Sequence, residues 1–289
     1  MKIKSYQADL LLVFVALSWG LTFALVKDAV EKMPVYAFLF WRFGSAFALL
    51  AIASYASWRR FNMATLWAGM LLGVLNFGAY AFQTFGLILT TSSAVAFITG
   101  LFVVMTPLLA WLFFRKAISK NVIAGVLLSM IGLWFLTGGK PLGMGLGEVY
   151  SLICALLFSL HLLCTDRFVK RYSVILLVTI QFATVALLSA AMGILYDGTL
   201  KADWHNSEFL VALVITVIFA TVFAFWVQSS MQRFTSPTKT ALIFTMEPLS
   251  AAVFGYLYAG EVLSLMQITG GLLIVAGVIF AELMTMKSS

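Results

Sequence analysis

The sequence predicts an all-α integral membrane protein with ten transmembrane helices that form two inverted repeats of five helices. Three observations predict this fold class: an apolar composition, ten long apolar segments, and a pattern of residues that recurs in the second half. Of the 289 residues, 63% are apolar and only 10% are charged. Soluble domains are about 45–50% apolar and about 25% charged. The composition therefore excludes a soluble enzyme, a disordered protein and a nucleic-acid-binding protein, and it makes the lipid bilayer the expected surroundings.

Ten segments are apolar and close to the roughly 20 residues that cross a bilayer as a helix. They are 8–27, 35–56, 64–87, 91–114, 119–137, 146–166, 173–196, 208–231, 238–259 and 264–285. Each is expected to be helical, because lipid offers an open sheet no hydrogen-bond partners. The apolar runs are also unbroken, whereas the strands of a transmembrane barrel alternate.

The basic residues predict the orientation. With ten spans and the N-terminus inside, thirteen of the 18 Lys and Arg residues fall in inside segments and four in outside segments, and Arg42 lies within a span. Loops rich in Lys and Arg stay in the cytoplasm. We interpret the net charge of +7 as this bias and not as a surface for anionic partners. Both termini are expected in the cytoplasm, in a multi-pass protein of the bacterial inner (plasma) membrane.

The second half of the chain echoes the first. From the third span onward, residues match counterparts 145 positions later, as Gln83 matches Gln228. The first two spans of each half match better at an offset of 139, as Ala16 matches Ala155. Because five helices per half is an odd number, the two copies would enter the membrane from opposite sides. Such inverted repeats are typical of alternating-access transporters, whose substrate site lies near the midplane. The alternative is chance similarity between apolar helices.

The predicted repeats divide the chain at residues 1–139 and 145–289. The link Gly138-Gly139-Lys140-Pro141 lacks the spacing of a phosphate-binding loop, so we interpret it as a tight connection. Glycines on the third and tenth spans, Gly270 among them, are expected at close helix contacts. A monomer or a weak homodimer through the last helices is expected.

Several short motifs occur in order along the chain. The first span contains Trp19-Gly20-Leu21-Thr22-Phe23, and Met33-Pro34 and Phe40-Trp41-Arg42-Phe43 follow it. Later come Met246-Glu247-Pro248-Leu249 and Ala259-Gly260-Glu261-Val262-Leu263-Ser264. In this order the motifs resemble the EamA family of the drug/metabolite transporter (DMT) superfamily, over essentially the whole chain. The resemblance implies a ten-helix, inverted-repeat carrier, often an exporter of amino acids or other small metabolites.

The two halves differ at these motifs. The first-half counterparts of Glu247-Pro248 are Phe102-Val103, and those of Gly260-Glu261 are Arg115-Lys116. Any coupling role of Glu247 is therefore not duplicated in the first half.

Two charged residues lie within predicted spans, where charges are costly and usually functional. Glu247 lies near the middle of the ninth span, beside Pro248, which removes a backbone hydrogen bond. It is a candidate site for a proton or a cationic substrate, or a structural carboxylate bonded to freed backbone or to another helix. Arg42, in the second span, is a candidate for binding a substrate carboxylate, for pairing with another helix, or for extending its charged end to the membrane interface.

A series of aromatic and polar residues predicts the walls of a cavity. Asn76, Tyr80 and Gln83 are spaced by four and three residues, so they share one helix face, and Trp19 is grouped with them. Their counterparts in the second half are Phe158, Thr221, Phe225 and Gln228. Polar faces in lipid turn toward the bundle interior, either to line a cavity or to bond between helices. Aromatic walls suit planar or apolar substrates, or a cation over a ring.

His161 is the remaining candidate, at the position that matches Thr22 in the first half. It is interpreted either as a hydrogen-bonded core residue or as a substrate contact. The sequence has two His and two Cys in total, without metal-ligand spacing, so neither a metal nor another cofactor is expected.

The sequence therefore favours a secondary carrier of a small organic solute, working outward by alternating access. Amino acids, including aromatic or apolar ones, are the first substrate class, and the export direction rests on the resemblance alone. The alternatives are an exporter of organic cations, quaternary amines or drugs, and a phosphorylated-solute antiporter. A membrane-embedded enzyme would need a cluster of His, Asp or Cys, and a channel would need a polar ring along a pore; neither is evident.

Overall fold

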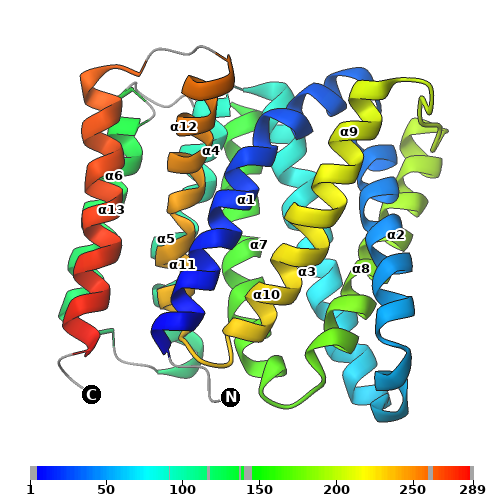
Figure 1. Cartoon of the computed structure of the whole chain (residues 1–289), viewed down its shortest axis with the longest axis horizontal. Coiled ribbons are helices and arrows are strands. Elements are labelled where there is room, and N and C mark those ends of the chain that lie inside the picture. The colour runs from blue at the N-terminus through cyan, green and yellow to red at the C-terminus, as the bar shows by residue number, and fades with distance from the viewer. Residues whose placement is uncertain are drawn as a thin grey trace.

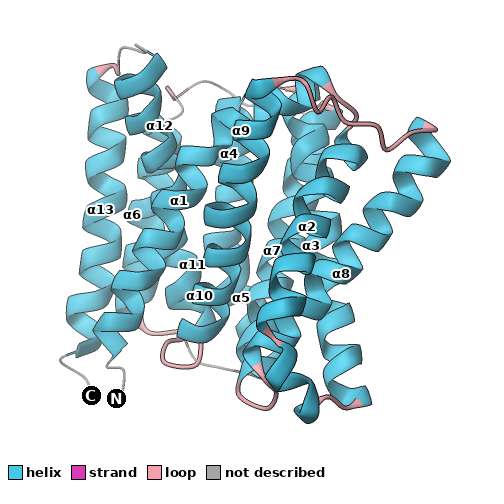
Figure 2. Ribbon diagram, turned by 45° about the vertical axis from the view of Figure 1, so that its right-hand side comes forward, coloured by secondary structure: helices cyan, strands magenta, loops and turns pink. Residues whose placement is uncertain are grey.

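The computed structural model describes residues 5–90, 92–115, 118–136, 138–139, 145–259 and 263–286. Within these ranges the chain is helical and contains no strand. The helices run side by side in one bundle, with the loops at its two ends (Figure 2). The start of α1 and the end of α13 lie at the same end of the bundle (Figure 1). The predicted all-α class is confirmed, whereas the arrangement as ten spans in two inverted repeats stays a prediction.

The helices follow one another along the chain with short connections. They are α1 (Ser5–Lys32), α2 (Val35–Ala53), η1 (Tyr55–Arg60), α3 (Met63–Leu89), α4 (Ser92–Gly100), α5 (Phe102–Phe114), α6 (Lys120–Leu136), α7 (Leu146–Val169), α8 (Val174–Met192), η2 (Gly193–Asp197), α9 (Ser207–Ile215), η3 (Thr216–Phe223), α10 (Ala224–Met231), α11 (Pro237–Phe244), α12 (Met246–Ala259) and α13 (Leu265–Met286).

Among the residues that the structure describes, six helical stretches are long and apolar enough to cross a membrane. They are Val35–Ala53, Met63–Leu89, Ala94–Phe114, Leu146–Val169, Val174–Asp197 and Ser207–Met231. Three shorter apolar helices accompany them, at Tyr6–Thr22, Lys120–Leu136 and Leu265–Phe280. All nine coincide with apolar segments recognised in the sequence, and the tenth segment corresponds to α11 and α12.

Two of the predicted spans are broken near their middle. The segment 91–114 is interrupted at Leu101, between α4 and α5, and the segment 238–259 at Thr245, between α11 and α12. At Thr245 the backbone N–H donates to Leu242 O, three residues back, at 3.1 Å. Pro248 explains this break, because its ring removes a backbone donor and clashes with the carbonyl four residues earlier. Transporter substrate sites are often formed by such discontinuous helices.

A third irregularity is the π-helical segment η3, between α9 and α10. The Thr221 hydroxyl donates to the Thr216 carbonyl oxygen, five residues back, at 2.8 Å. Short π-helical segments are frequent at functional sites because they turn side chains out of the regular helical register. In this chain η3 delivers Ala220 and Thr221 to the neighbourhood of Arg42, as described below.

Helices α6 and α13 pack against each other at one side of the bundle (Figure 1). A Cβ atom on Gly132 would lie 2.6 Å from the carbonyl oxygen of Gly270, and one on Gly270 would lie 2.6 Å from that of Gly132. Only glycine permits backbones to approach this closely. The close contact expected at Gly270 is therefore present.

Some features predicted from the sequence lie outside the described residues. These are the Gly260-Glu261 motif, the Lys140-Pro141 part of the link between the predicted repeats, and several of the basic residues used for orientation.

Candidate functional site

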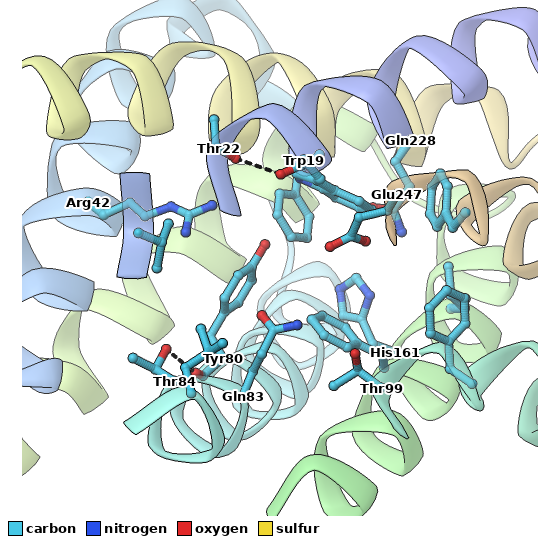
Figure 3. Close-up of a pocket in the computed structure, with 17 residues that line it drawn as sticks. Trp19, Thr22, Arg42, Tyr80, Gln83, Thr84, Thr99, His161, Gln228 and Glu247 are labelled. Carbon is cyan, nitrogen blue, oxygen red and sulfur yellow. Dashed lines mark hydrogen bonds between the residues drawn. The ribbon is translucent and has the colours of Figure 1, made fainter. Parts of the chain in front are cut away.

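A pocket lies in the middle of the bundle, enclosed by helices from both halves of the chain (Figure 3). Its volume is about 60 Å³. The residues that line it are Trp19, Thr22, Val26, Arg42, Tyr80, Gln83, Thr84, Leu87, Thr99, Phe102, Phe158, His161, Leu162, Phe225, Gln228, Phe244 and Glu247. Most of these side chains are aromatic, aliphatic or neutral polar, and the pocket contains one cationic and one anionic group.

The structure brings together nine of the ten residues proposed as site residues from the sequence. They are Trp19, Arg42, Tyr80, Gln83, Phe158, His161, Phe225, Gln228 and Glu247. Their shared position around one pocket is a fact of the fold, whereas their role in binding remains a prediction.

Asn76 is the exception, because it is fully buried and does not line the pocket. It lies about one helical turn before Tyr80 on α3. Its amide nitrogen and oxygen have no hydrogen-bond partner among the described residues. The structure therefore leaves Asn76 out of the wall that Tyr80 and Gln83 share, and its role in binding stays a prediction.

Aromatic rings form much of the wall. The ring centroid of Trp19 lies 4.9 Å from that of Phe244 and 5.6 Å from that of Phe225. The Trp19 indole N–H donates to the Ala220 carbonyl at 2.8 Å, which fixes the orientation of the ring. Across the pocket, Tyr80 meets Phe158 edge to face at 5.6 Å. Such edge and tilted contacts are favourable for aromatic pairs and make the wall stiff.

Gly20 explains how α1 comes so near to Glu247. A Cβ atom at this position would lie 2.5 Å from the Glu247 carbonyl oxygen and 2.7 Å from the Ala251 backbone nitrogen. Any larger residue would push α1 away from α12. The Trp19-Gly20 motif therefore places an aromatic wall and a close helix contact at adjacent positions.

Arg42 is buried, with 2% of its surface exposed, and is fixed by several contacts. Its Nε donates to Thr221 Oγ1 at 2.8 Å, and its Nη2 donates to the Ala220 carbonyl at 3.4 Å. Its Cζ lies 4.9 Å from the centre of the Tyr80 ring, a distance typical of cation–π contacts. A guanidinium has five N–H donors, so donors remain for a group within the pocket.

Glu247 lies in the first turn of α12, directly after the break at Thr245. Its carboxylate points into the pocket (Figure 3). Within the described part of the chain, this carboxylate forms no hydrogen bond and no ion pair within 4.0 Å, either with Arg42 or with another residue. The first turn of a helix is a favourable place for a negative charge. The site therefore offers one carboxylate that is free to meet a positively charged group.

His161 is hydrogen-bonded in the core and also lines the pocket, and its contact with a substrate stays a prediction. Its Nε2 lies 3.1 Å from Gln181 Oε1, so it is hydrogen-bonded between α7 and α8. It also lines the pocket, where its ring faces Phe225 edge to face with the centroids 6.0 Å apart. The residue joins the pocket wall to the buried polar interior behind it.

The sequence analysis missed several lining residues. Thr84 and Leu87 follow Tyr80 by four and seven positions, and Thr22 and Val26 follow Trp19 by three and seven, so the helix period could have identified them. Phe102, Phe244, Thr99 and Leu162 complete the missed set. Phe102 directly follows the break at Leu101, and Phe244 directly precedes the break at Thr245. No pattern in the sequence indicates that these two rings turn into the pocket.

The described residues contain no group of three or more His, Cys, Asp or Glu side chains that could hold a metal ion. Cys154 and Cys164 are free thiols. The described lining of the pocket therefore presents aromatic rings, one positive charge and one negative charge to a ligand.

Comparison with known families gives this pocket its context. The profile of the EamA-like transporter family matches residues 7–138 and 145–283. The chain belongs to the EamA-like transporter family. As an EamA-like protein of the drug/metabolite transporter superfamily, it is a multi-pass membrane transporter.

Individual relatives cover nearly the same length. An uncharacterized transporter of Archaeoglobus fulgidus is 31% identical over 281 residues, which is 97% of this chain and 87% of the relative. The uncharacterized transporter YdfC of Bacillus subtilis is 24% identical and matches 93% of this EamA-like chain and 89% of its own. A solved crystal structure with 19% sequence identity aligns with a TM-score of 0.83, over 99% of this chain and 100% of that chain. This last similarity concerns the fold alone.

Proposed function

We propose that the protein is a secondary carrier that moves amino acids with apolar or aromatic side chains outward through the central pocket by alternating access. One observation carries the proposal: Arg42 and Glu247 line the same aromatic-walled pocket, and no ion pair between them exists within the described residues. An amino acid carries an ammonium group and a carboxylate on one carbon atom. It can therefore pair with both charged side chains at once, which a solute without charged groups cannot do.

Each part of the solute has a partner in this proposal. The ammonium group meets the Glu247 carboxylate, and the carboxylate meets the remaining N–H donors of Arg42. The apolar side chain packs among Trp19, Phe158 and Phe225. The amides of Gln83 and Gln228 can donate or accept, so they adapt to either polar group.

The pocket must widen to hold such a solute. The pocket has a volume of about 60 Å³. One water molecule occupies about 10–15 Å³ of such a volume, so the pocket holds only a few waters and is too small for an amino acid. We infer that this structure is a contracted state of the transport cycle. Breaks at Leu101 and Thr245 are natural positions for the widening, because each interrupts a helix beside the pocket.

The inverted repeat is part of the proposal. It is supported by the family profile, which matches two segments of similar length. It is also supported by the helix breaks at Leu101 and Thr245, which are 144 positions apart, close to the offset of 145 between the halves. Tyr80 and its counterpart Phe225 meet beside the pocket with their centroids 6.2 Å apart. Two halves that face each other across a central substrate site can rotate relative to each other around that site, which opens it to the two sides of the membrane in turn.

Competitive counterflow in proteoliposomes tests the substrate class. Vesicles loaded with unlabelled L-phenylalanine would take up labelled L-phenylalanine in the presence of phenethylamine, which lacks the carboxylate, or of phenylpropionate, which lacks the ammonium group. We expect saturable uptake, with each analogue competing at least about tenfold less well, because one charged side chain would be left unpaired.

Two variants refine this test. In Glu247→Gln, the advantage of phenylalanine over phenylpropionate should disappear. The matched control is Glu148→Gln, which removes a carboxylate that accepts from Thr90 Oγ1 at 2.6 Å and does not line the pocket. Saturable counterflow that both analogues inhibit as well as phenylalanine would contradict the proposal.

An organic cation is the second candidate substrate. It is favoured by the free Glu247 carboxylate beside the rings of Trp19 and Phe158, which is the chemistry that holds ammonium groups. In the same assay this candidate predicts that phenethylamine or a quaternary amine competes better than phenylalanine. It also predicts that Arg42 contributes only to the fold.

A further inference from the structure

A second hollow lies apart from the central pocket and is formed by the start of α3, the turn between α7 and α8, and the residues that follow α10. The turn between α7 and α8 lies at the end of the bundle where α1 begins and α13 ends (Figure 1). Its volume is about 480 Å³. Four of its lining residues are cationic, namely Arg60, Lys170, Arg171 and Arg233.

The positive charge of this hollow is poorly neutralised. None of the described residues that line it is Asp or Glu. Lys170 pairs with Asp166 on its own helix, with 2.6 Å between Nζ and Oδ1. Arg60 and Arg171 form no ion pair with any residue that the structure describes. Two guanidinium groups therefore remain available to an anion, which they can bind with two parallel hydrogen bonds each.

Arg233 fixes the shape of the hollow. Its side chain donates to the backbone carbonyls of Val169 and Tyr172, and the second of these bonds is 2.9 Å long. These bonds hold the turn between α7 and α8 in place and leave the charge of Arg233 at the wall. Arg233 is thus a fixed cationic group in the wall, whereas Arg60 and Arg171 are exposed beside it.

Neutral donors add to the site. Asn62 accepts from the Thr65 backbone N–H at 2.8 Å through its side-chain oxygen, so its amide N–H groups stay available. Ser173 lines the hollow and precedes α8 without capping it by a side-chain hydrogen bond. The free N–H groups at the start of such a helix favour an anion.

We infer that this hollow binds a phosphate-bearing anion. Several guanidinium groups with neutral donors around them match the charge and the oxygen atoms of a phosphate. The anion can be the headgroup of an anionic lipid or a free phosphate. The exposed rings of Trp58 and Phe61 flank Arg60 and are the kind of residue that anchors a protein at the headgroup level. The site is separate from the proposed transport pocket. Binding there would attach this end of the bundle to anionic lipid or to a dissolved anion.

Thermal unfolding of the purified full chain in detergent micelles tests the inference. The melting temperature would be measured against increasing phosphatidylglycerol, inorganic phosphate and zwitterionic phosphatidylcholine. Binding to the folded state raises the melting temperature with concentration. Stabilisation by phosphatidylglycerol alone assigns the site to a lipid headgroup, and stabilisation by inorganic phosphate as well assigns it to the free anion. Equal effects of phosphatidylglycerol and phosphatidylcholine, or no effect of either anion, would overturn the inference.

Two double variants locate the effect. In Arg60→Gln/Arg171→Gln the half-saturating concentration of the anion should rise about tenfold or more. The control Arg59→Gln/Lys120→Gln removes the same charge from exposed residues that do not line the hollow, and it should bind as the wild type does. An equal loss in both variants would mean general attraction to a basic surface and would also overturn the inference.

A measurement on the wild type keeps the test valid if the first double variant does not fold. The half-saturating concentration should rise with ionic strength, because added salt screens exposed charges. Binding that ignores ionic strength would rule out recognition by these guanidinium groups.

Discussion

Arg42 and Glu247 are the two charged residues in the described lining of the central pocket, and they differ in the contacts that their charged groups make. The Arg42 guanidinium bonds to Thr221 and Ala220 and lies against the Tyr80 ring. The Glu247 carboxylate points into the pocket and has no hydrogen bond or ion pair with the described residues (Figure 3). The charge of Arg42 is therefore satisfied by neighbouring groups, whereas the charge of Glu247 has no partner among the described residues.

The difference teaches how a charge inside a membrane protein can be classified. A charge that neighbouring helices have already satisfied contributes to the structure, and its removal leaves those neighbours unpaired. A charge without such partners contributes little to stability, so its presence needs another reason. Replacing Arg42 should therefore lower both stability and transport, whereas replacing Glu247 should lower transport and change stability little.

Arg42→Met should have the largest effect. It removes two hydrogen bonds and the cation–π contacts with Tyr80 and Phe43 from a buried site, so we expect a loss of about 3 kcal/mol in the free energy of unfolding, together with most of the transport. Detergent-solubilised melting curves and counterflow measure the two losses. An Arg42→Met protein with wild-type stability would remove the distinction between the two charges.

Glu247→Gln should affect transport and leave the fold intact. The carboxylate has no bond to lose within the described residues, so the change in stability should stay below about 1 kcal/mol. Counterflow should fall at least about tenfold. The pH profile of the remaining counterflow should be flatter than that of the wild type, if this carboxylate exchanges a proton. Wild-type rates with an unchanged profile would make Glu247 a structural residue.

Thr221→Val should have an intermediate effect. The Thr221 hydroxyl accepts from Arg42 Nε at 2.8 Å and donates to the Thr216 carbonyl at 2.8 Å. Its loss should cost about 1.5 kcal/mol of stability and reduce transport by less than about tenfold, because the guanidinium keeps its charge. Melting curves on the Thr221→Val and Arg42→Met single and double variants measure the coupling. Fully additive losses would show that the hydrogen bond does not hold Arg42.

Tyr80→Phe should have the smallest effect. The ring that lies 4.9 Å from Arg42 Cζ is kept, so stability should change by less than about 0.5 kcal/mol. The hydroxyl group is lost from the pocket wall, so only the relative affinities of polar and apolar solutes should shift. A large loss of stability would show that the hydroxyl, and not the ring, supports the guanidinium.

Much of the fold could be predicted because lipid leaves the backbone few options. Unbroken apolar segments such as 64–87 become helices, and the structure has α3 at Met63–Leu89. The break at Leu101 could not be predicted, because it needs only a local change in backbone hydrogen bonding. The break at Thr245 had a signal in Pro248, but a proline in a transmembrane segment does not by itself say whether the helix bends or breaks.

The site was predictable to the extent that costly residues must point inward. Arg42, Glu247 and the pair Gln83 and Gln228 are polar groups that lipid would expel, so their convergence follows from solvation. The positions of Phe102 and Phe244 could not be predicted in this way, because a phenylalanine side chain is equally stable in lipid and in an apolar pocket. Asn76 shows the opposite limit, since it is polar and buried but lies outside the pocket.

The contact between α6 and α13 bears on how the chain is made. Gly132 and Gly270 bring these helices together, although one lies near the middle of the chain and the other close to its end. Synthesis proceeds from the N-terminus, so α6 enters the membrane long before its partner exists. The face of α6 that carries Gly132 therefore lacks its partner until α13 has been translated. A nascent chain that stops before α13 should therefore be recognised by quality-control proteases, even though it holds every residue of the central pocket.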